Sequence, residues 1–148
     1  MRKCKGIEKS KIWDALQLGM PKDAAQIRQS VFVEEQGFQK EFDDIDGRAY
    51  HVVVYDGKSP AATGRIFKIE DDVYSIGRVA VLKNYRGKRL GTMVLELLEK
   101  KAAELGAKQV RLSAQLQARS FYEKCGYTAY GTEYHDEFCP HIGMKKQL

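Results

Sequence analysis

A basic loop with two glycines, RGKRLG at residues 86–91, follows an apolar run and precedes a segment with helical spacing. A glycine-containing turn at the start of a helix directs several backbone N–H groups the same way, and the positive end of the helix dipole lies at the same point. Such a turn suits anions, phosphate or pyrophosphate above all. Arg86, Lys88 and Arg89 add positive charge there. The loop is therefore a candidate phosphate site.

The same loop has a plainer interpretation, a solvated basic start of a helix, and the residues alone do not separate the two. It is not a Walker loop, because no Gly-Lys-Ser or Gly-Lys-Thr follows, and it is not a dinucleotide fingerprint. A nucleic-acid surface is a third interpretation. Aromatic side chains do not interleave with the basic ones in a stacking pattern, and the net charge is only +5. We therefore expect no nucleic-acid partner.

Two other groups of residues could bind metal ions. EFDDIDG at 41–47 has the composition of a calcium loop, but Phe42 and Val53 stand where the first Asp and the closing Glu are needed. His135, Cys139 and His141 could be arranged as zinc ligands, but no fourth ligand is evident. We expect no metal, and histidines, His51 included, that are polar or partly buried.

The acidic residues around this loop are interpreted as a solvated face. Five carboxylates lie within a short stretch, and a charge run of this kind is usually exposed. The five are Glu34, Glu35, Asp43, Asp44 and Asp46.

The elements that must hold these groups follow from apolar spacing. The first third of the chain is interpreted as helical, because Ala24, Ile27 and Val31 recur at steps of three and four, and Gly37 ends the segment. HVVVYDGKSPAATGRIFKI at 51–69 predicts a hairpin around a turn-rich cluster. VYSIGRVAVL at 73–82 predicts a third, adjacent antiparallel strand.

The second half of the chain predicts a long helix over 90–105, whose apolar residues form one stripe, and a strand in KQVRLSA at 108–114. A short helix over 118–125 ends at Gly126, and YTAYGTEY and HIGMKK predict two last strands. The order predicts a mixed α/β fold of the α+β type. We expect a central, mostly antiparallel sheet of six to seven strands with helices on both faces, as a single domain over residues 1–148.

Composition limits the class of protein. With 148 residues, 43% of them hydrophobic and 30% charged, the chain is long enough for one core and too apolar for disorder. Its cysteines, Cys4, Cys125 and Cys139, are odd in number and form no Cys-x-x-Cys, which favours a reducing compartment. No apolar run approaches a membrane span of about 18 residues, and the basic start has no apolar stretch behind it. We expect a cytoplasmic protein without a membrane partner.

Several motifs together resemble a known family. RGKRLG at 86–91 resembles the Arg-x-x-Gly-x-Gly/Ala signature of the GNAT superfamily of acyl-CoA N-acyltransferases, and ARSFYEKCGY at 118–127 resembles that family's Ala-x-x-Phe-Tyr-x-x-x-Gly-Phe segment. VFVEEQ at 31–36, IGRVAV at 76–81, Ala114-Gln115 and HIGM at 141–144 are similar to the small bacterial ElaA-like subgroup. The resemblance covers nearly the whole chain.

The resemblance implies an N-acetyltransferase that moves an acetyl group from acetyl-CoA to a primary amine by direct attack in a ternary complex. It places acetyl-CoA where two strands, ending near Leu82 and Ala114, splay apart. A backbone N–H near Val79 or Ala80 would stabilise the oxyanion. The implied cofactor-binding residues are Val79, Ala80, Val81, Arg86, Gly87, Lys88, Arg89, Leu90, Gly91, Thr92 and Gln115.

The resemblance also implies that Tyr122 protonates the leaving thiolate. From the residues alone Tyr122 would be a core tyrosine, because it lies on the apolar stripe of a short helix; the resemblance favours the catalytic role. Phe121, one residue off that face, is expected to point into the core. A non-catalytic acyl-CoA sensor would share the whole cleft and is the alternative function.

Two departures from the family pattern stand out. Arg89 occupies the signature's glycine position, and we expect it inside the first helical turn with a negative φ. Some members carry a Glu on the strand before the loop, but residues 74–77 here contain no carboxylate. The acceptor is expected to be a small-molecule or peptide amine and the protein a monomer or homodimer. An acidic rim would attract a cationic amine, whereas Arg78 would hold a carboxylate, and these two hints conflict.

Overall fold

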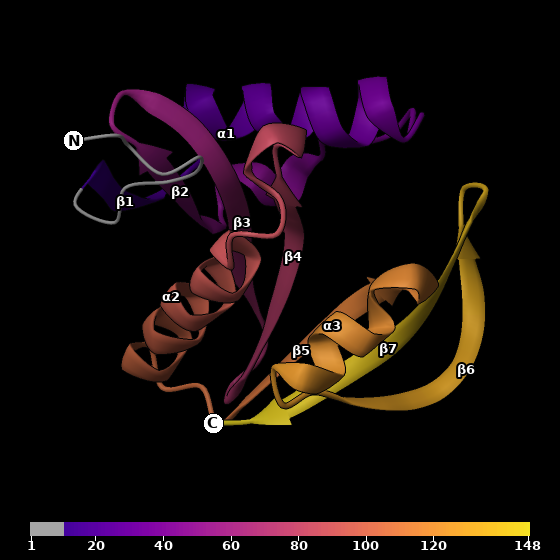
Figure 1. The fold of residues 1–148 in the computed structure, drawn as a ribbon. Coiled ribbons are helices and arrows are strands. Elements are labelled where there is room, and N and C mark those ends of the chain that lie inside the picture. The colour runs from indigo at the N-terminus through magenta and orange to yellow at the C-terminus, as the bar shows by residue number, and fades with distance from the viewer. Residues whose placement is uncertain (1–10) are drawn as a thin grey trace.

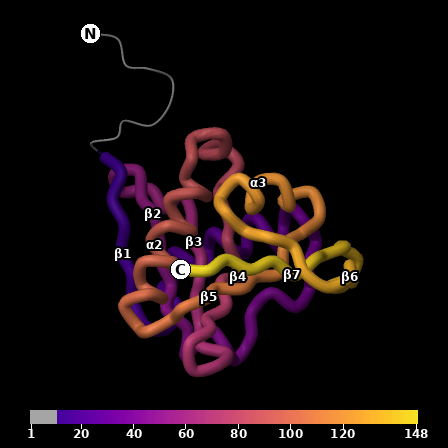
Figure 2. Tube along the Cα trace, turned by 90° about the horizontal axis from the view of Figure 1, so that it is seen from below, coloured from indigo at the N-terminus to yellow at the C-terminus, as the bar shows by residue number. Residues whose placement is uncertain are grey.

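In the computed structural model, which describes residues 11–148, seven strands form one sheet in the order β1-β2-β3-β4-β5-β7-β6. Figure 2 shows the strand labels running from β1 at one side to β6 at the other. All neighbouring strands are antiparallel except β4 and β5, which are parallel. The strands are β1 (Ile12–Leu18), β2 (Tyr50–Asp56), β3 (Ser59–Glu70), β4 (Val73–Val81), β5 (Gln109–Gln115), β6 (Thr128–Asp136) and β7 (Cys139–Gln147).

Helices cover both faces of this sheet, so the mixed fold predicted from the sequence is confirmed. α1 (Lys22–Arg28) continues as a π-helical turn, Gln29–Glu35, which Gly37 follows. The other helices are α2 (Leu90–Glu104), α3 (Arg119–Lys124) and the 3₁₀ turns Asp44–Gly47, Lys83–Tyr85 and Leu116–Ala118. Among residues 11–148, no helix combines the length and apolar character needed to cross a bilayer.

Two hydrophobic clusters lie on opposite faces of the sheet. Successive side chains of a strand alternate between faces, and in β2 Val52 and Val54 belong to the cluster beneath α2, whereas Val53 belongs to the cluster beneath α1. This double burial explains why β2 is apolar at consecutive positions. Gly64 in β3 permits the close approach of α2, because a Cβ there would lie 2.7 Å from Val94 Cγ1.

The first strand was not predicted. β1 occupies Ile12–Leu18, a stretch that the sequence analysis assigned to a helical first third. As an edge strand it leaves most of its side chains exposed, so its apolar positions carry little periodic signal. Trp13 is held instead by stacking on Tyr55, with ring centroids 4.1 Å apart. Cys4 lies outside the described residues.

The parallel pair β4 and β5 diverges soon after it begins. The two strands pair only where Val73–Ser75 meets Gln109–Arg111, and both continue well beyond that point (Figure 1). β4 has a β-bulge at this point. The two-residue step from Thr63 to Arg65 in β3 pairs with the three-residue step from Ala80 to Gly77 in β4. Arg78, which lies within the bulge, has a φ of +53°. Bulges bend a strand and increase its twist. The bulge therefore helps to turn the end of β4 away from β5.

Candidate active site

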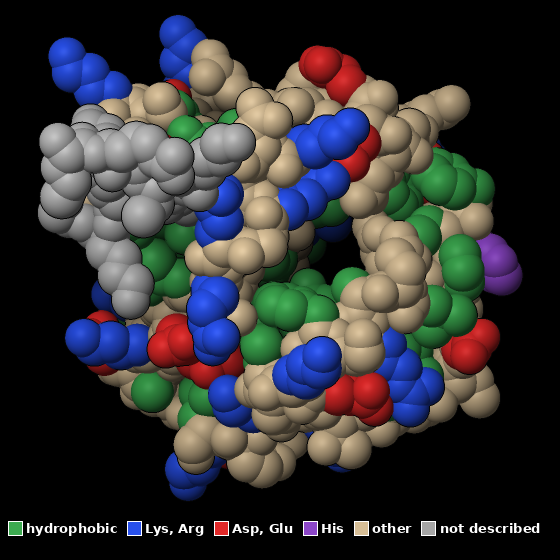
Figure 3. All heavy atoms as spheres, viewed as in Figure 1, with side chains coloured by type: hydrophobic (Ala, Val, Ile, Leu, Met, Phe, Trp, Pro, Cys, Tyr) green, Lys and Arg blue, Asp and Glu red, His purple; other side chains and the backbone are tan. Residues whose placement is uncertain are grey.

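A cleft of about 1000 Å³ occupies the space between the diverging ends of β4 and β5. Figure 3 shows this face of the molecule hollowed between β4 and α3. Its walls come from the π-helical turn after α1 and the loop that follows it, from β4, from the loop and first turns of α2, and from β5, α3 and β7. The cleft is therefore built by elements from both halves of the chain.

Almost all of the site residues predicted from the sequence line this cleft. The exception is Lys88, which lies on the same loop but outside the lining. The residues brought together are Val79, Ala80, Val81, Arg86, Gly87, Arg89, Leu90, Gly91, Thr92, Gln115 and Tyr122.

The edge of β4 that faces the cleft carries backbone groups without a strand partner. The N–H of Leu82 donates to the Ala61 carbonyl of β3 at 2.9 Å. Because N–H and C=O directions alternate along a strand, those of Ala80 also face β3, whereas those of Val79 and Val81 face the cleft. Of the two oxyanion donors proposed from the sequence, Val79 is the one with a suitable direction. Arg86 Nε donates to the Val81 carbonyl at 2.9 Å.

The loop before α2 turns through two residues with left-handed backbone. Gly87 has a φ of +77° and Arg89 a φ of +65°. Arg89 precedes the helix as its N-cap, and α2 begins at Leu90. The expectation of a negative φ at Arg89 was therefore wrong. The position lies outside the first helical turn and favours glycine, because a side chain in the left-handed region costs about 1 to 2 kcal/mol.

Replacing Arg89 by glycine should therefore stabilise the protein. We expect Arg89→Gly to raise the free energy of unfolding by about 0.5 to 1 kcal/mol, because the relief of strain exceeds the added freedom of the unfolded chain. Urea denaturation monitored by circular dichroism measures this difference. Lys88→Gly is the matched control, since Lys88 has no positive φ, and it should lose stability. Equal changes in both variants would show that Arg89 is not strained.

Gly91 lets α3 lie against the first turn of α2. A Cβ at Gly91 would meet Phe121 Cζ at 3.1 Å and Val81 Cγ2 at 3.8 Å. Phe121 packs against the core, as predicted, but it is only partly buried and also lines the cleft. The two family-like motifs thus touch each other through this glycine.

An ion pair joins the loop to the π-helical turn that follows α1. Arg86 donates from both terminal nitrogens to the two carboxylate oxygens of Glu35, each at 2.6 Å. These hydrogen bonds lower the pKa of the Glu35 carboxyl. Both side chains remain about 40% exposed. Glu35, expected to be free in solvent, is therefore exposed but paired.

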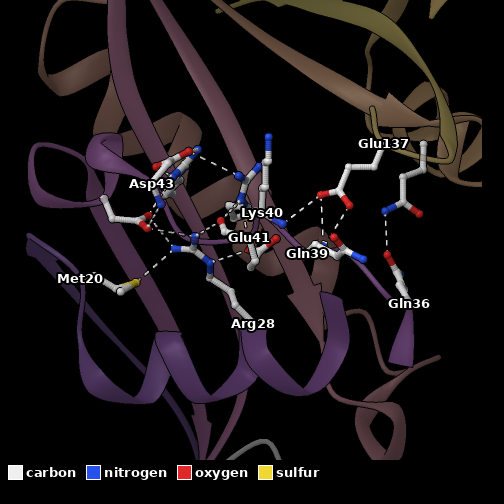
Figure 4. A network of polar contacts seen from close by, with 12 residues as sticks. Met20, Arg28, Gln36, Gln39, Lys40, Glu41, Asp43 and Glu137 are labelled. Carbon is white, nitrogen blue, oxygen red and sulfur yellow. Dashed lines mark hydrogen bonds and ion pairs between the residues drawn. The ribbon is translucent and has the colours of Figure 1, made fainter. Parts of the chain in front are cut away.

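The expectation of a solvated acidic face was wrong for Asp46, which is buried, and Glu41 in the same loop is buried as well. Arg28 projects from α1 into the loop that carries Glu41 and Asp43 (Figure 4). Its Nε lies 2.9 Å from Glu41 Oε2, and one terminal nitrogen lies 2.7 Å from Asp46 Oδ1. The sequence could not show this, because the arginine partners come from separate elements.

Two further arginines complete this network. Arg65 on β3 donates to Asp43 at 2.8 Å and to Asp46 at 2.7 Å. Arg78 on β4 lies 3.0 Å from Glu41 Oε2 and 3.4 Å from Asp43 Oδ2. Arg78 thus holds carboxylates, as its type suggested, but they belong to this chain. Burial raises the pKa of Glu41 in spite of its arginines.

Tyr122 lies on α3 and shares the cleft wall with Ala118, one helical turn earlier. Its ring packs edge-on against Phe121 and Tyr127, with centroids 5.0 and 5.9 Å away. Burial, with a smaller contribution from Cys125, raises the pKa of the phenol. Its hydroxyl makes no hydrogen bond within residues 11–148 and is not sealed from solvent. The proton is therefore available to a molecule in the cleft.

The histidines occupy three different environments. His51 and His141 are buried, and His135 is exposed. Only His141 of these lines the cleft, which the sequence did not predict because a strand pattern does not show which face meets a cavity. Within the described part of the chain, no three His, Cys, Asp or Glu side chains are grouped so as to hold a metal ion.

A parallel pair of strands that splays beside a glycine loop at a helix start defines the fold of the acyl-CoA-dependent acyltransferases. The sequence carries the same assignment: residues 18–127 match the acetyltransferase (GNAT) family, and the chain belongs to that family. It is therefore an acyltransferase of the acyl-CoA-dependent kind.

Individual relatives agree with this assignment. The uncharacterized N-acetyltransferase YjcF of Bacillus subtilis is 39% identical over 84% of this chain and 91% of its own. A solved structure from Lactobacillus plantarum, assigned as an N-acetyltransferase, is 33% identical with a TM-score of 0.85, covering 93% of this chain and 98% of its own. Escherichia coli ElaA has a TM-score of 0.79 at 26% identity, covering 91% and 97%. The resemblance to ElaA-like proteins is confirmed.

Proposed function

We propose that this protein is an N-acetyltransferase that moves the acetyl group of acetyl-CoA to the primary amine of a small molecule or peptide by direct attack in a ternary complex. The observation that carries the proposal is the unpaired edge of β4, which leads into the left-handed turn before α2. An extended pantetheine arm can pair with Val79 and Val81 as a strand would. The amides after Gly87 suit the pyrophosphate.

Tyr122 supplies the proton that the departing thiolate needs. Its unshared hydroxyl lines the cleft, and its raised pKa keeps the phenol protonated throughout the physiological range. The N–H of Val79 stabilises the oxyanion that forms when the amine attacks the thioester carbonyl. The N–H acts on the carbonyl oxygen and the phenol acts on the sulfur, while the amine nitrogen attacks the carbonyl carbon directly and no covalent acyl-enzyme is formed.

The experiment that tests this function measures the release of free CoA thiol from acetyl-CoA. The acceptors are phenethylamine, spermidine, glutamate and a lysine-containing peptide, each with a no-amine blank. Amine-dependent release supports the transferase. Tight binding of acetyl-CoA with no release on any acceptor would support the alternative, a non-catalytic acyl-CoA sensor, which would share the cleft.

The loop before α2 should control affinity for acetyl-CoA. We expect Gly91→Asp to weaken binding about 10-fold or more, equivalent to about 1.4 kcal/mol, because it brings a negative charge and a Cβ to the first turn of α2. Isothermal titration calorimetry gives the Kd. Ala103→Asp is the control, because it adds the same single charge at an exposed position of α2 outside the cleft, and it should change the Kd by less than about 3-fold. Unchanged affinity in Gly91→Asp would exclude this loop as the phosphate site.

A further inference from the structure

His141 lies in β7 and lines the cleft. Its sequence neighbour Ile142 belongs to the cluster beneath α2. Because side chains alternate along a strand, His141 faces the opposite side of the sheet, where Phe38 packs edge-on against its ring at 6.4 Å. The ring is only 5% exposed, and the residue lines the cleft. It therefore sits on the α1 side of the divergence between β4 and β5.

The hydrogen bonding of this ring fixes its tautomer. Nδ1 lies 2.9 Å from the carbonyl oxygen of Cys139. A carbonyl oxygen can only accept, so Nδ1 carries the proton and the neutral ring keeps its lone pair on Nε2. Nε2 has no hydrogen-bond partner within residues 11–148. Over the same range, the only buried side-chain nitrogen or oxygen without a partner is Arg65 Nε. Nε2 of His141 therefore has no partner in the described protein and is not buried, and the residue that carries it lines the cleft.

Packing holds the ring in this orientation. Tyr134 of β6 stacks on it with a centroid distance of 6.0 Å, and Phe38 closes the edge. The other histidines lack this combination: His51 uses Nε2 to bond the Asp46 carbonyl at 2.9 Å, and His135 is exposed outside the cleft. A fixed imidazole with a free lone pair in a cleft is the arrangement of a general base.

The proposed reaction requires such a base. An alkyl amine has a pKa of about 10.4, so at neutral pH it arrives as an ammonium ion without a lone pair. Four carboxylates line the cleft. Glu41 is committed to Arg28 and Arg78, and Glu99 to Tyr127 and Lys146. Glu96 is exposed on α2. Asp136 is exposed near the end of β6. A carboxylate, with an ordinary pKa of about 4, is also less well matched to neutral pH than an imidazole at about 6.5.

We infer that His141 is the general base that takes a proton from the acceptor ammonium, an assignment that rests on the proposed function. Nε2 accepts one ammonium proton, and the freed nitrogen lone pair forms the C–N bond while the carbonyl electrons move to oxygen. When the C–S bond breaks, the thiolate takes the Tyr122 proton. The proton that leaves nitrogen as the amide forms restores the Tyr122 phenol through solvent, and His141 releases its proton to solvent. One proton is released per amide formed.

Several elements are packed around this ring, and some of them carry titratable or charged groups. β5 presents only the neutral Gln115 and Ser113 beside it. Titratable and charged groups both occur on the other elements around this end of the cleft. They are Tyr134 and Asp136 of β6, Glu137 of the β6–β7 turn, Cys139 of β7, Lys40 and Glu41 of the loop after the π-helical turn, and Arg78 of β4.

The test compares His141→Asn with His135→Asn. Asparagine can still donate an N–H to the Cys139 carbonyl but has no basic nitrogen. With the fastest amine of the acceptor panel, we expect kcat/KM of His141→Asn to fall about 10²-fold at pH 7. The deficit should shrink toward about pH 10, where the amine loses its proton unaided. Acetyl-CoA affinity and the His135→Asn profile should match wild type. A deficit that is equal at every pH, or none, would overturn the assignment.

A second measurement does not depend on turnover or on the folding of a variant. Nitrogen NMR of the wild-type protein at about pH 8 reads the protonation state of each ring nitrogen of His141. We expect His141 with a protonated Nδ1 and a bare Nε2. A protonated Nε2 removes the base whatever the assay gives. The remaining outcome is an unprotonated Nε2 in a wild-type protein that releases no CoA thiol with any amine. That result would refute the transferase function, and the role of His141 as general base with it, but not the described orientation of the ring.

Discussion

Tyr122→Phe should lower kcat by about 10²-fold or more, the usual range for the loss of a general acid, while the Kd for acetyl-CoA stays at its wild-type value. The substitution removes one hydroxyl that has no hydrogen-bond partner within residues 11–148 and keeps the ring that packs on Phe121 and Tyr127. Steady-state release of CoA thiol measures kcat, and calorimetry measures the Kd.

Tyr127→Phe is the matched control for this experiment. It deletes the same group from the neighbouring ring, whose hydroxyl donates to Glu99 at 2.7 Å and lies outside the cleft. We expect a loss of stability there with kcat nearly unchanged. Because the pKa of Tyr122 is raised, wild type should also show no alkaline loss of kcat from this group up to about pH 10, the ordinary tyrosine value. A wild-type rate in Tyr122→Phe would mean that the thiolate leaves without this acid.

The elements with strong local patterns were predictable from the sequence. The helix over 90–105 carries an apolar stripe and a glycine stop, and the structure places α2 there. The hairpin and the third strand were equally clear, because their runs are rich in β-branched and other apolar residues and a turn-rich cluster separates the first two. β1 was missed because it is an exposed edge strand. What decides whether an element can be predicted is therefore how much of its own surface the fold buries.

The candidate site also contains residues that were predictable from the sequence and residues that were not. The loop at 86–91 and Tyr122 were predicted from sequence motifs, and the structure brings them to one cleft. The left-handed backbone at Arg89 was mispredicted because a single arginine carries no signal of its φ. The burial of Asp46 and the place of His141 depend on contacts between elements far apart in the chain. No local pattern records such contacts, so these features required the fold.

Arg28→Met should destabilise the protein by about 3 to 5 kcal/mol, the usual cost of leaving buried charges without their partner. Arg28 is 1% exposed and bonds Glu41 and Asp46 together, and it also donates to the Glu41 carbonyl at 3.1 Å. Methionine fills much of the same volume, so the loss is mainly electrostatic. Urea denaturation at neutral pH gives the free energy of unfolding.

Arg119→Met is the control for the loss of an arginine ion pair. Arg119 lies 3.4 Å from Glu123, and the two side chains are 43% and 48% exposed. Exposed pairs contribute about 0 to 1 kcal/mol, so this variant should remain close to wild type. A similar small loss in Arg28→Met would show that the buried network contributes little beyond its packing.

The pH dependence of the free energy of unfolding, compared between wild type and Arg28→Met, separates the contribution of the Arg28 charge from that of its packing. Burial alone would raise the pKa of Asp46, but the hydrogen bonds from Arg28 and the Asp43 backbone outweigh it and lower the value from 3.8 to about 2. A carboxyl whose pKa is depressed in the folded state stabilises the protein above its unfolded pKa, and that stability is lost as the pH falls through the folded value. Wild type should therefore lose the Asp46 contribution between about pH 4 and about pH 2.

Glu41 has the opposite effect on the pH dependence of stability. Burial raises the pKa of its carboxyl, so the folded state binds the proton more tightly than the unfolded state, and protonation of Glu41 at low pH favours folding. In Arg28→Met, the carboxyls of both residues lose one arginine partner, although Asp46 keeps Arg65 and Glu41 keeps Arg78. Both should take up protons at higher pH than in wild type, since protonation removes a buried charge. The stability difference between variant and wild type should therefore narrow from neutral pH toward about pH 4. A difference that stays constant over this range would assign the loss to packing around Arg28 and not to its charge.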